Sequence, residues 1–133
     1  MSIKIGFVGL GKMGSQLVSK LLASGIEVVV MDRGSEVVKK MQAEGALAAT
    51  DRAQMLAELG EHPVIWLMIP SDVVEGELTA WSEVLPEGAL VIDGGNSDWR
   101  LTSARGARLA EKGIMLMDAG TSGGVLGHEN GFS

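Results

Sequence analysis

Gly9-Leu10-Gly11-Lys12-Met13-Gly14 is the stretch that decides the fold, because this GxGxxG turn stands between an apolar run, 3–9, and a segment with helical periodicity. A second apolar run, 27–32, follows that segment and ends in Asp32. A strand, a glycine-rich turn, a helix and a second strand that ends in an acidic residue together form the fingerprint of a dinucleotide-binding unit. An ordinary glycine turn is the alternative, and the agreement of all the parts argues against it.

The three glycines of this turn have separate roles in the expected unit. Gly9 permits the tight turn, Gly11 lets the backbone approach a pyrophosphate, and Gly14 lets the helix pack closely on the strand. Backbone N–H groups at the positive end of the helix would then bind the anion. The sequence therefore predicts that phosphate is held locally by the backbone.

Asp32 and Arg33 bear on the choice of dinucleotide. Asp32 lies where an acidic side chain accepts hydrogen bonds from the adenosine ribose, and its charge would repel a 2′-phosphate. This favours NAD. Arg33 can bind a 2′-phosphate or stack on adenine, so NADP stays open as the alternative.

Short apolar runs bounded by Gly or Asp alternate with stretches of helical periodicity, a pattern that indicates a parallel sheet. The expected strands are 3–9, 27–32, 46–49, 64–69, 89–93 and 114–119. Runs that are apolar throughout predict strands buried on both faces. The fold class expected is α/β, a Rossmann-type doubly wound parallel sheet of about six strands with helices on both faces.

Capping residues mark where the helices between these strands should begin and end. Met13, Leu17, Val18, Leu21 and Leu22 form the apolar face of a first helix, which Gly25 should end. Two of the later helices are predicted from their caps: Ser35 before 36–44, and Asp51, with Gln54 as a capping box, before 52–59. Ser71 should open the next helix, which Pro86 should stop. Ser97 should cap the last helix, which Gly113 should end.

Composition limits the classes of function. The 133 residues are 46% hydrophobic and 21% charged, which fits a single globular domain over 1–133. Eleven basic against seventeen acidic residues give a net charge of −6, which argues against a nucleic-acid or anionic-membrane surface resting on bulk positive charge. Cys is absent and His62 and His128 are isolated, so we expect neither thiol chemistry nor a metal site.

The beginning of the chain, MSIKIGFVGLGKMG, lacks the basic region, long apolar run and cleavage site of a secretory signal. The sequence also has no uncharged apolar stretch long enough to span a membrane. A cytoplasmic protein is the expectation.

Two further motifs follow the fifth and sixth expected strands. They are Ile92-Asp93-Gly94-Gly95-Asn96-Ser97 and Asp118-Ala119-Gly120-Thr121-Ser122-Gly123-Gly124. Ligands bind beyond the carboxyl ends of strands in such a sheet, so these turns can bring backbone amides, Asn96 and Ser122 toward a polar substrate. The alternative is that the glycines only make tight turns from strand to helix.

Together these motifs make the sequence resemble the 6-phosphogluconate dehydrogenase family, within the wider β-hydroxyacid dehydrogenases, over nearly the whole chain. The resemblance rests on GLGKMG, Trp66-Leu67-Met68-Ile69-Pro70, IDGGNS, the 102–113 stretch and DAGTSGG. The 3-hydroxyisobutyrate dehydrogenase branch has a shorter Ser/Thr-rich turn in place of GGN and a proline where Gly120 stands. Asp32-Arg33 replaces the Asn-Arg-Thr of NADP-dependent members and resembles the NAD-preferring bacterial branch.

The resemblance implies a set of contacts and a reaction. Cofactor contacts are implied for Gly9, Leu10, Gly11, Met13, Asp32, Arg33, Met68, Ile69, Pro70 and Asn96. Substrate contacts are implied for Asn96, Ser122, Gly123 and Gly124. The implied reaction is the oxidation of 6-phosphogluconate by NAD or NADP, followed by decarboxylation to ribulose 5-phosphate in the pentose phosphate pathway.

The family's catalytic lysine and glutamate find no counterpart up to Ser133. In the family they lie beyond the dinucleotide domain, near a helical domain that also builds most of the homodimer. We therefore expect 1–133 to be a cofactor-binding domain without turnover of its own, whose oligomeric state is open between monomer and homodimer. A stand-alone NAD(H)-binding or regulatory module and another β-hydroxyacid dehydrogenase are the alternatives, although a sensor would need no IDGGNS or SGG turn.

Overall fold

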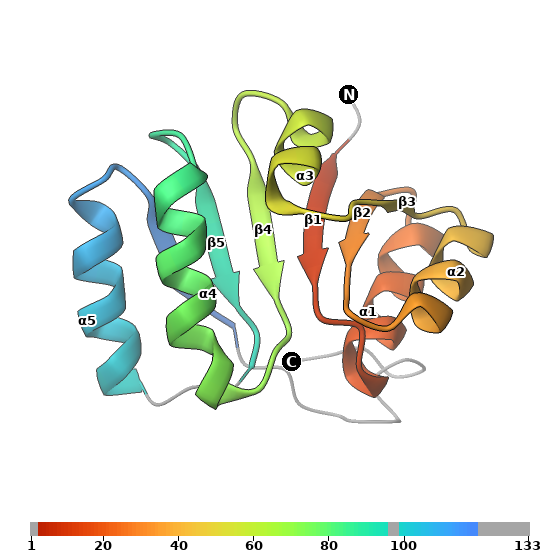
Figure 1. Ribbon diagram of the computed structural model, residues 1–133, viewed down its shortest axis with the longest axis horizontal. Helices are drawn as coiled ribbons and strands as arrows, with labels where there is room; N and C mark the ends of the chain where they lie inside the picture. Colours follow the sequence, from red (N-terminus) through yellow and green to blue (C-terminus); the bar gives the residue numbers. More distant parts are fainter. Residues whose placement is uncertain (1–2, 96–98, 120–133) are drawn as a thin grey trace.

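The computed structural model describes residues 3–95 and 99–119, with side chains described from Ser103 onward in the second range. Strands and helices alternate along this part of the chain (Figure 1). Their bounds are β1 Lys4–Val8, α1 Lys12–Ala23, β2 Glu27–Met31, α2 Ser35–Ala43, β3 Leu47–Ala48, α3 Arg52–Leu59, β4 Val64–Leu67, α4 Ser71–Val84, β5 Leu90–Asp93, α5 Trp99–Ala110 and β6 Met115–Asp118. None of these helices is both long enough and apolar enough to cross a bilayer.

The six strands form one parallel sheet in the order β3-β2-β1-β4-β5-β6. From β1 the chain adds β2 and β3 on one side, then returns to add β4, β5 and β6 on the other. The order therefore reverses between β1 and β4, whose carboxyl ends lie at the lower edge of the sheet in Figure 1. This confirms the Rossmann-type doubly wound sheet, and it places the ligand crevice of such sheets beside the ends of β1 and β4.

Two hydrophobic cores lie on opposite faces of the sheet, so helices cover both faces as predicted. One core joins the sheet to α3, α4 and α5 and contains Met55, Ile65 and Trp81. The other joins it to α1 and α2 and contains Phe7, Leu17 and Met41. Side chains alternate between the faces along each strand, which is why Ile65 belongs to the first core while the next residue, Trp66, packs against the second.

The prediction of strands buried on both faces is wrong for β6. Met115 is 64% exposed and Met117 is 49% exposed, whereas Leu116 packs against the core formed with α3, α4 and α5. β6 is an edge strand of the sheet that the described residues form. The buried residues of the opposite core lie in β1, β2, α1 and α2, in the turn after β1 and in the segment before β3, so this core does not extend to β6.

The N-cap predicted for α3 is confirmed, whereas the N-cap of α2 differs from the predicted residue. Asp51 caps α3, and its Oδ1 accepts the N–H of Gln54 at 2.8 Å. Gln54 Oε1 accepts the N–H of Thr50 at 2.8 Å, so the reciprocal bond of the capping box is shifted by one residue. Ser35 is the first residue of α2 rather than its cap, because Asp32 Oδ1 accepts the N–H of Gly34 and starts the helix one residue earlier. The predicted cap Ser97 lies outside the described residues.

Glycine is required at two positions where backbone segments meet. Gly9 has φ +97°, and a Cβ there would lie 2.2 Å from the carbonyl oxygen of Met68. A Cβ on Gly14, in the first turn of α1, would lie 2.4 Å from the carbonyl oxygen of Gly9. These contacts confirm the tight turn at Gly9 and the close packing of α1 at Gly14.

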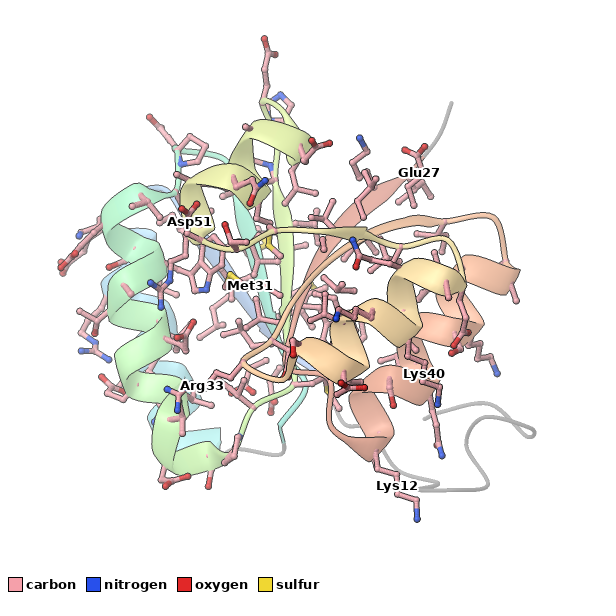
Figure 2. The ribbon with its side chains drawn as sticks, turned by 45° about the vertical axis from the view of Figure 1, so that its right-hand side comes forward. Lys12, Glu27, Met31, Arg33, Lys40 and Asp51 are labelled. Carbon is pink, nitrogen blue, oxygen red and sulfur yellow. The ribbon has the colours of Figure 1, made fainter. Side chains whose placement is uncertain are left out.

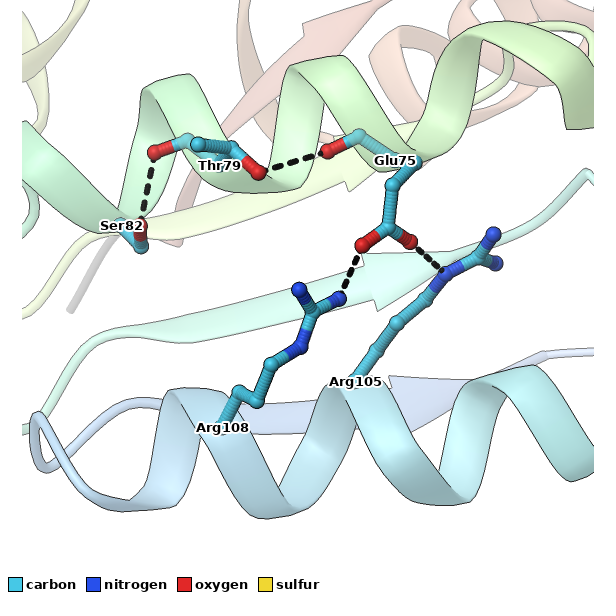
Figure 3. Close-up of polar contacts among 5 residues, drawn as sticks. All are labelled: Glu75, Thr79, Ser82, Arg105 and Arg108. Atoms are coloured by element: carbon cyan, nitrogen blue, oxygen red, sulfur yellow. Dashed lines mark hydrogen bonds and ion pairs between the residues drawn. The ribbon is translucent and has the colours of Figure 1, made fainter.

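Glu75 ties α4 to α5 (Figure 3). Its carboxylate accepts a hydrogen bond from Arg105 Nε at 2.6 Å and another from Arg108 Nη2. Thr79 and Ser82 on the same helix donate instead to backbone carbonyls, those of Glu75 and Thr79. The hydrogen bond from Arg105, and after it the one from Arg108, holds the pKa of Glu75 below its ordinary value.

Gly14→Ala is expected to lower the free energy of unfolding by about 1–3 kcal/mol, because the added methyl group meets a backbone oxygen that cannot move freely. Gly76→Ala in α4 is the matched control, since its methyl group meets no atom within 4 Å beyond its own helix. That control should gain about 0.5–1 kcal/mol. Urea unfolding followed by circular dichroism measures both changes. Equal effects of the two substitutions would contradict the packing role of Gly14.

The stability that the Glu75 pair contributes should depend on pH. Because the folded-state pKa of Glu75 lies below the unfolded value near 4.5, this contribution is present above that pH and is lost as the pH falls through the folded pKa. The stability difference between wild type and Glu75→Gln should therefore be largest near neutral pH and shrink toward acid. Exposed Glu83 on the same helix supplies the control, Glu83→Gln. A Glu75→Gln difference that stays constant from neutral pH to pH 3 would be inconsistent with the lowered pKa.

Candidate functional site

A pocket of about 640 Å³ opens at the carboxyl edge of the sheet, where the strand order reverses. Its wall is formed by residues from the ends of β1, β2 and β4, from the segment before α3, and from α3 and the first two turns of α4. They are Val8, Gly9, Leu10, Gly11, Met31, Asp32, Arg33, Thr50, Arg52, Met68, Ile69, Pro70, Val73 and Glu77. The volume lies in the range of small-molecule and cofactor sites.

Most of the residues implied for cofactor contact are brought together here. Gly9, Leu10, Gly11, Asp32, Arg33, Met68, Ile69 and Pro70 line the pocket. Met13, in the first turn of α1, is not one of its lining residues. Asn96, Ser122, Gly123 and Gly124 lie outside the described residues. Contact of any of these residues with a cofactor or substrate stays a prediction.

The amino end of α1 is free of the groups that commonly neutralise a helix start. Its cap is Gly11, which offers no side-chain acceptor, and its first turn contains no acidic residue. A Cβ on Gly11 would meet nothing within 4 Å, so this backbone borders open space. The side chain of Lys12 points away from the body of the protein (Figure 2). No described side chain caps the first N–H groups of α1, and an open helix start of this kind fits the pyrophosphate of a dinucleotide.

Asp32 holds the walls of the pocket together. Its Oδ2 accepts the N–H of Leu10 at 2.6 Å and its Oδ1 accepts the N–H of Gly34 at 2.7 Å. The carboxylate thus joins the glycine-rich turn after β1 to the turn after β2, a structural role that the sequence did not reveal. Each carboxylate oxygen can accept a further hydrogen bond, so the residue also fits a ribose hydroxyl in the pocket.

Arg33 follows Asp32 and is exposed at the pocket rim, beyond the end of β2 (Figure 2). Among the described residues its guanidinium has no hydrogen-bond or ion-pair partner. Its donors are therefore available either for the face of a base or for a phosphate.

Sequence analysis missed Thr50, Arg52, Val73 and Glu77. These residues belong to α3, α4 and the segment before α3, and they reach the pocket only through the packing of those helices against the sheet. No motif marks them, because their place in the same pocket as the glycine-rich turn depends on packing between residues far apart in the sequence.

The turn after β5 packs tightly against the turn after β4. A Cβ on Gly94 would lie 2.5 Å from Trp66 Nε1, and one on Gly95 would lie 2.6 Å from the carbonyl oxygen of Ile69. Asp93, only 1% exposed, accepts the N–H of Gly95 at 2.9 Å. Close packing alone accounts for both glycines, so they do not in themselves indicate a ligand.

Comparison with known proteins decides the family. Residues 4–133 match the family model described as the NAD binding domain of 6-phosphogluconate dehydrogenase. The chain belongs to this family. The match extends over all of the described residues except Ile3 and includes the pocket at the carboxyl edge.

Relatives of the family include full-length enzymes. The chain is 38% identical to the NAD(+)-dependent, decarboxylating 6-phosphogluconate dehydrogenase of Haloferax volcanii, covering 98% of this chain and 43% of that protein. It is 36% identical to the decarboxylating enzyme of Haemophilus influenzae, covering 100% of this chain and 29% of that protein. The chain therefore spans less than half the length of these curated relatives.

A solved structure shows the same architecture. The 3-hydroxyisobutyrate dehydrogenase of Mycobacterium tuberculosis, determined with L-serine, matches with a TM-score of 0.84 at 26% identity. The match covers 96% of this chain and 43% of that structure. The 6-phosphogluconate dehydrogenase of Plasmodium falciparum, at 23% identity and a TM-score of 0.85, supports the fold alone. The chain is thus similar in fold to two branches of the wider β-hydroxyacid dehydrogenases.

Asp32→Ala is expected to lower the free energy of unfolding by about 1–3 kcal/mol, because it removes the acceptor of two backbone N–H groups. Asp118→Ala is the matched control: Asp118 also ends a strand, is exposed, and accepts no hydrogen bond from the described residues. The control should change stability by less than about 0.5 kcal/mol. Thermal and urea unfolding test both variants, and an equal loss in the two would contradict the joining role of Asp32.

Proposed function

We propose that this chain binds NAD in the pocket at the carboxyl edge and is the cofactor domain of an enzyme that oxidises and decarboxylates 6-phosphogluconate. The observation that carries the proposal is the pairing of an open helix start with a fixed carboxylate in one pocket. Gly11 caps α1 without a side-chain acceptor, and Asp32 holds the adjoining turn through Leu10. A dinucleotide needs both features, one for its pyrophosphate and one for its ribose.

The proposed cofactor residues divide between the parts of the cofactor. Gly9, Leu10, Gly11 and Met13 would hold the pyrophosphate, and Asp32 the adenosine ribose. Arg33 would lie on the adenine side, while Met68, Ile69, Pro70 and Asn96 would line the path toward the nicotinamide. When bound, the nicotinamide ring supplies the acceptor for a hydride.

NAD is the proposed cofactor, with NADP as the alternative. The charge of Asp32 disfavours a 2′-phosphate beside the ribose, whereas the unpartnered guanidinium of Arg33 would attract one. The Haloferax volcanii relative is named as NAD(+)-dependent, which supports NAD.

The substrate and the whole protein are proposed from the family. Asn96, Ser122, Gly123 and Gly124 would contact the substrate, a small phosphorylated sugar acid. The catalytic lysine and glutamate would come from a helical domain outside 1–133, so this chain alone would bind cofactor without turnover. We place the enzyme in the cytoplasm, as a homodimer when complete, with this domain alone a monomer.

Another β-hydroxyacid dehydrogenase is the second candidate. The 2-(hydroxymethyl)glutarate dehydrogenase of Eubacterium barkeri is 33% identical over 98% of this chain, close to the identity of the 6-phosphogluconate enzymes. The two candidates share the cofactor site and differ in the acid that is oxidised.

Calorimetric titration of the 133-residue chain tests the cofactor. NAD should bind at least about tenfold more tightly than NADP, a difference of about 1.4 kcal/mol. Asp32→Asn keeps an oxygen acceptor and removes the charge, so it should narrow that preference, whereas Asp118→Asn should leave it unchanged. A folded chain that binds neither dinucleotide would overturn the proposal, and a preference for NADP would assign the decisive role to Arg33. Incubation with 6-phosphogluconate and either cofactor should yield no reduced cofactor.

A further inference from the structure

The pocket contains a charged pair that the cofactor residues above do not explain. Arg52, the first residue of α3, and Glu77, on α4, both line the pocket with Asp32 and Arg33. Arg52 Nη2 lies 2.7 Å from Glu77 Oε1. The side chains remain 34% and 20% exposed, so the pair faces the pocket rather than the core.

Trp81 fixes the position of this pair. Its Nε1 donates to Glu77 Oε2 at 3.1 Å, and the guanidinium carbon of Arg52 lies 5.6 Å from the centre of the Trp81 ring. Trp81 itself is fully buried in the core beneath α4. Both charged groups are therefore held by a rigid aromatic side chain.

The simplest explanation of this ion pair is that it holds α3 against α4. That role, however, leaves several N–H groups of the guanidinium without a hydrogen bond. Bidentate pairing through Nε and one Nη atom is the strong arrangement for arginine and a carboxylate. Here only Nη2 pairs with Glu77, and the buried Nε has no acceptor among the described residues. The buried Nε cannot reach a ligand, so the donors open to the pocket are those of Nη1, which is neither buried nor hydrogen-bonded among the described residues and lies beside the carboxylate of Glu77.

We infer that Arg52 and Glu77 recognise the amino edge of the adenine base, an inference that rests on the proposed binding of NAD. Along its N7 edge adenine presents a ring nitrogen, N7, that accepts a hydrogen bond beside an exocyclic amine that donates one. Arg52 supplies the matching donor and Glu77 the matching acceptor. The same pocket holds Asp32 for the ribose and Arg33 at the rim, so the base enters beside the sugar.

This arrangement selects against bases with a carbonyl group in place of the amine. In hypoxanthine the carbonyl oxygen would face the carboxylate of Glu77, so an attractive contact becomes a repulsive one. A site that pairs hydrogen-bonding groups with its ligand rejects analogues that leave those groups unpaired. The pair makes Arg52 and Glu77 specificity-determining residues for the base.

Calorimetric titration with NAD and with nicotinamide hypoxanthine dinucleotide tests the inference on the 133-residue chain. These ligands differ at position 6 of the base, an amine in adenine and a carbonyl in hypoxanthine, and at N1, which carries a hydrogen only in hypoxanthine, whereas N7 accepts a hydrogen bond in both. Wild type should bind NAD about tenfold more tightly, which corresponds to about 1.4 kcal/mol. Glu77→Gln should reduce the preference to less than about threefold, because an amide can donate to the carbonyl oxygen of hypoxanthine.

Glu75→Gln is the matched control, since Glu75 lies on the same helix, is paired with two arginines and does not line the pocket. It should keep the wild-type preference. If Glu77→Gln does not fold, Arg52→Lys tests the same pair, because lysine retains the charge without the second planar donor. Without the planar donor that holds N7, the base is no longer fixed with its position 6 against Glu77, so this variant should also lose most of the preference.

The outcomes separate the inference from the proposed function. Equal binding of the two dinucleotides by wild type, or an unchanged preference in folded Glu77→Gln and Arg52→Lys, would overturn the base recognition while leaving NAD binding intact. The ion pair between Arg52 and Glu77 would then serve only to hold α3 against α4. A folded wild type that binds neither ligand would overturn the proposed function and the inference with it.

Discussion

The contact of three backbone segments at the carboxyl edge is the constraint on which the rest of the structure depends. The turn after β1 meets the start of α1 at Gly14 and the turn after β4 at Met68, with Gly9 between them. Hydrogen bonds from the N–H of Gly9 to Met31 and from that of Met68 to Val8 hold the neighbouring strand ends at the same level. Because no side chain separates these segments, α1 starts directly beside the pocket and directs its first N–H groups toward it.

An acidic chain with a net charge of −6 has to bind an anionic dinucleotide through fixed local groups. The first turn of α1 contains no carboxylate, and Asp32 is engaged by the N–H groups of Leu10 and Gly34. Asp32 therefore both holds the turns after β1 and β2 together and lines the pocket. Stability and the proposed preference for NAD are linked at this residue, since any change that alters its charge also alters the turn it holds.

The fold could be predicted from the sequence because its signals are local. The GxGxxG turn, the apolar runs and the Asp51 cap each depend on residues a few positions apart, and the structure has them where they were expected. Long-range features could not be predicted in this way. Arg52 and Glu77 reach the pocket through the packing of two helices, and the apolar run of β6 does not reveal which of its faces is covered. The sequence predicted that the glycine-rich turn, Asp32-Arg33 and the 68–70 turn lie together, and they line one pocket, whereas Met13 does not line it and the wall formed by α3 and α4 was not predicted.

The two edges of the sheet differ in how many backbone hydrogen-bonding groups they leave available for a further strand. β3 contributes two residues to one edge, whereas β6 contributes four to the other, with Met115 and Met117 exposed on one of its faces. An edge strand offers unpaired N–H and C=O groups to any further strand, and a short edge offers few of them. The sheet can therefore be extended by backbone pairing on the β6 side much more readily than on the β3 side. Flexible thioether side chains there can adapt to the surface of an added element without a matching shape being built in advance.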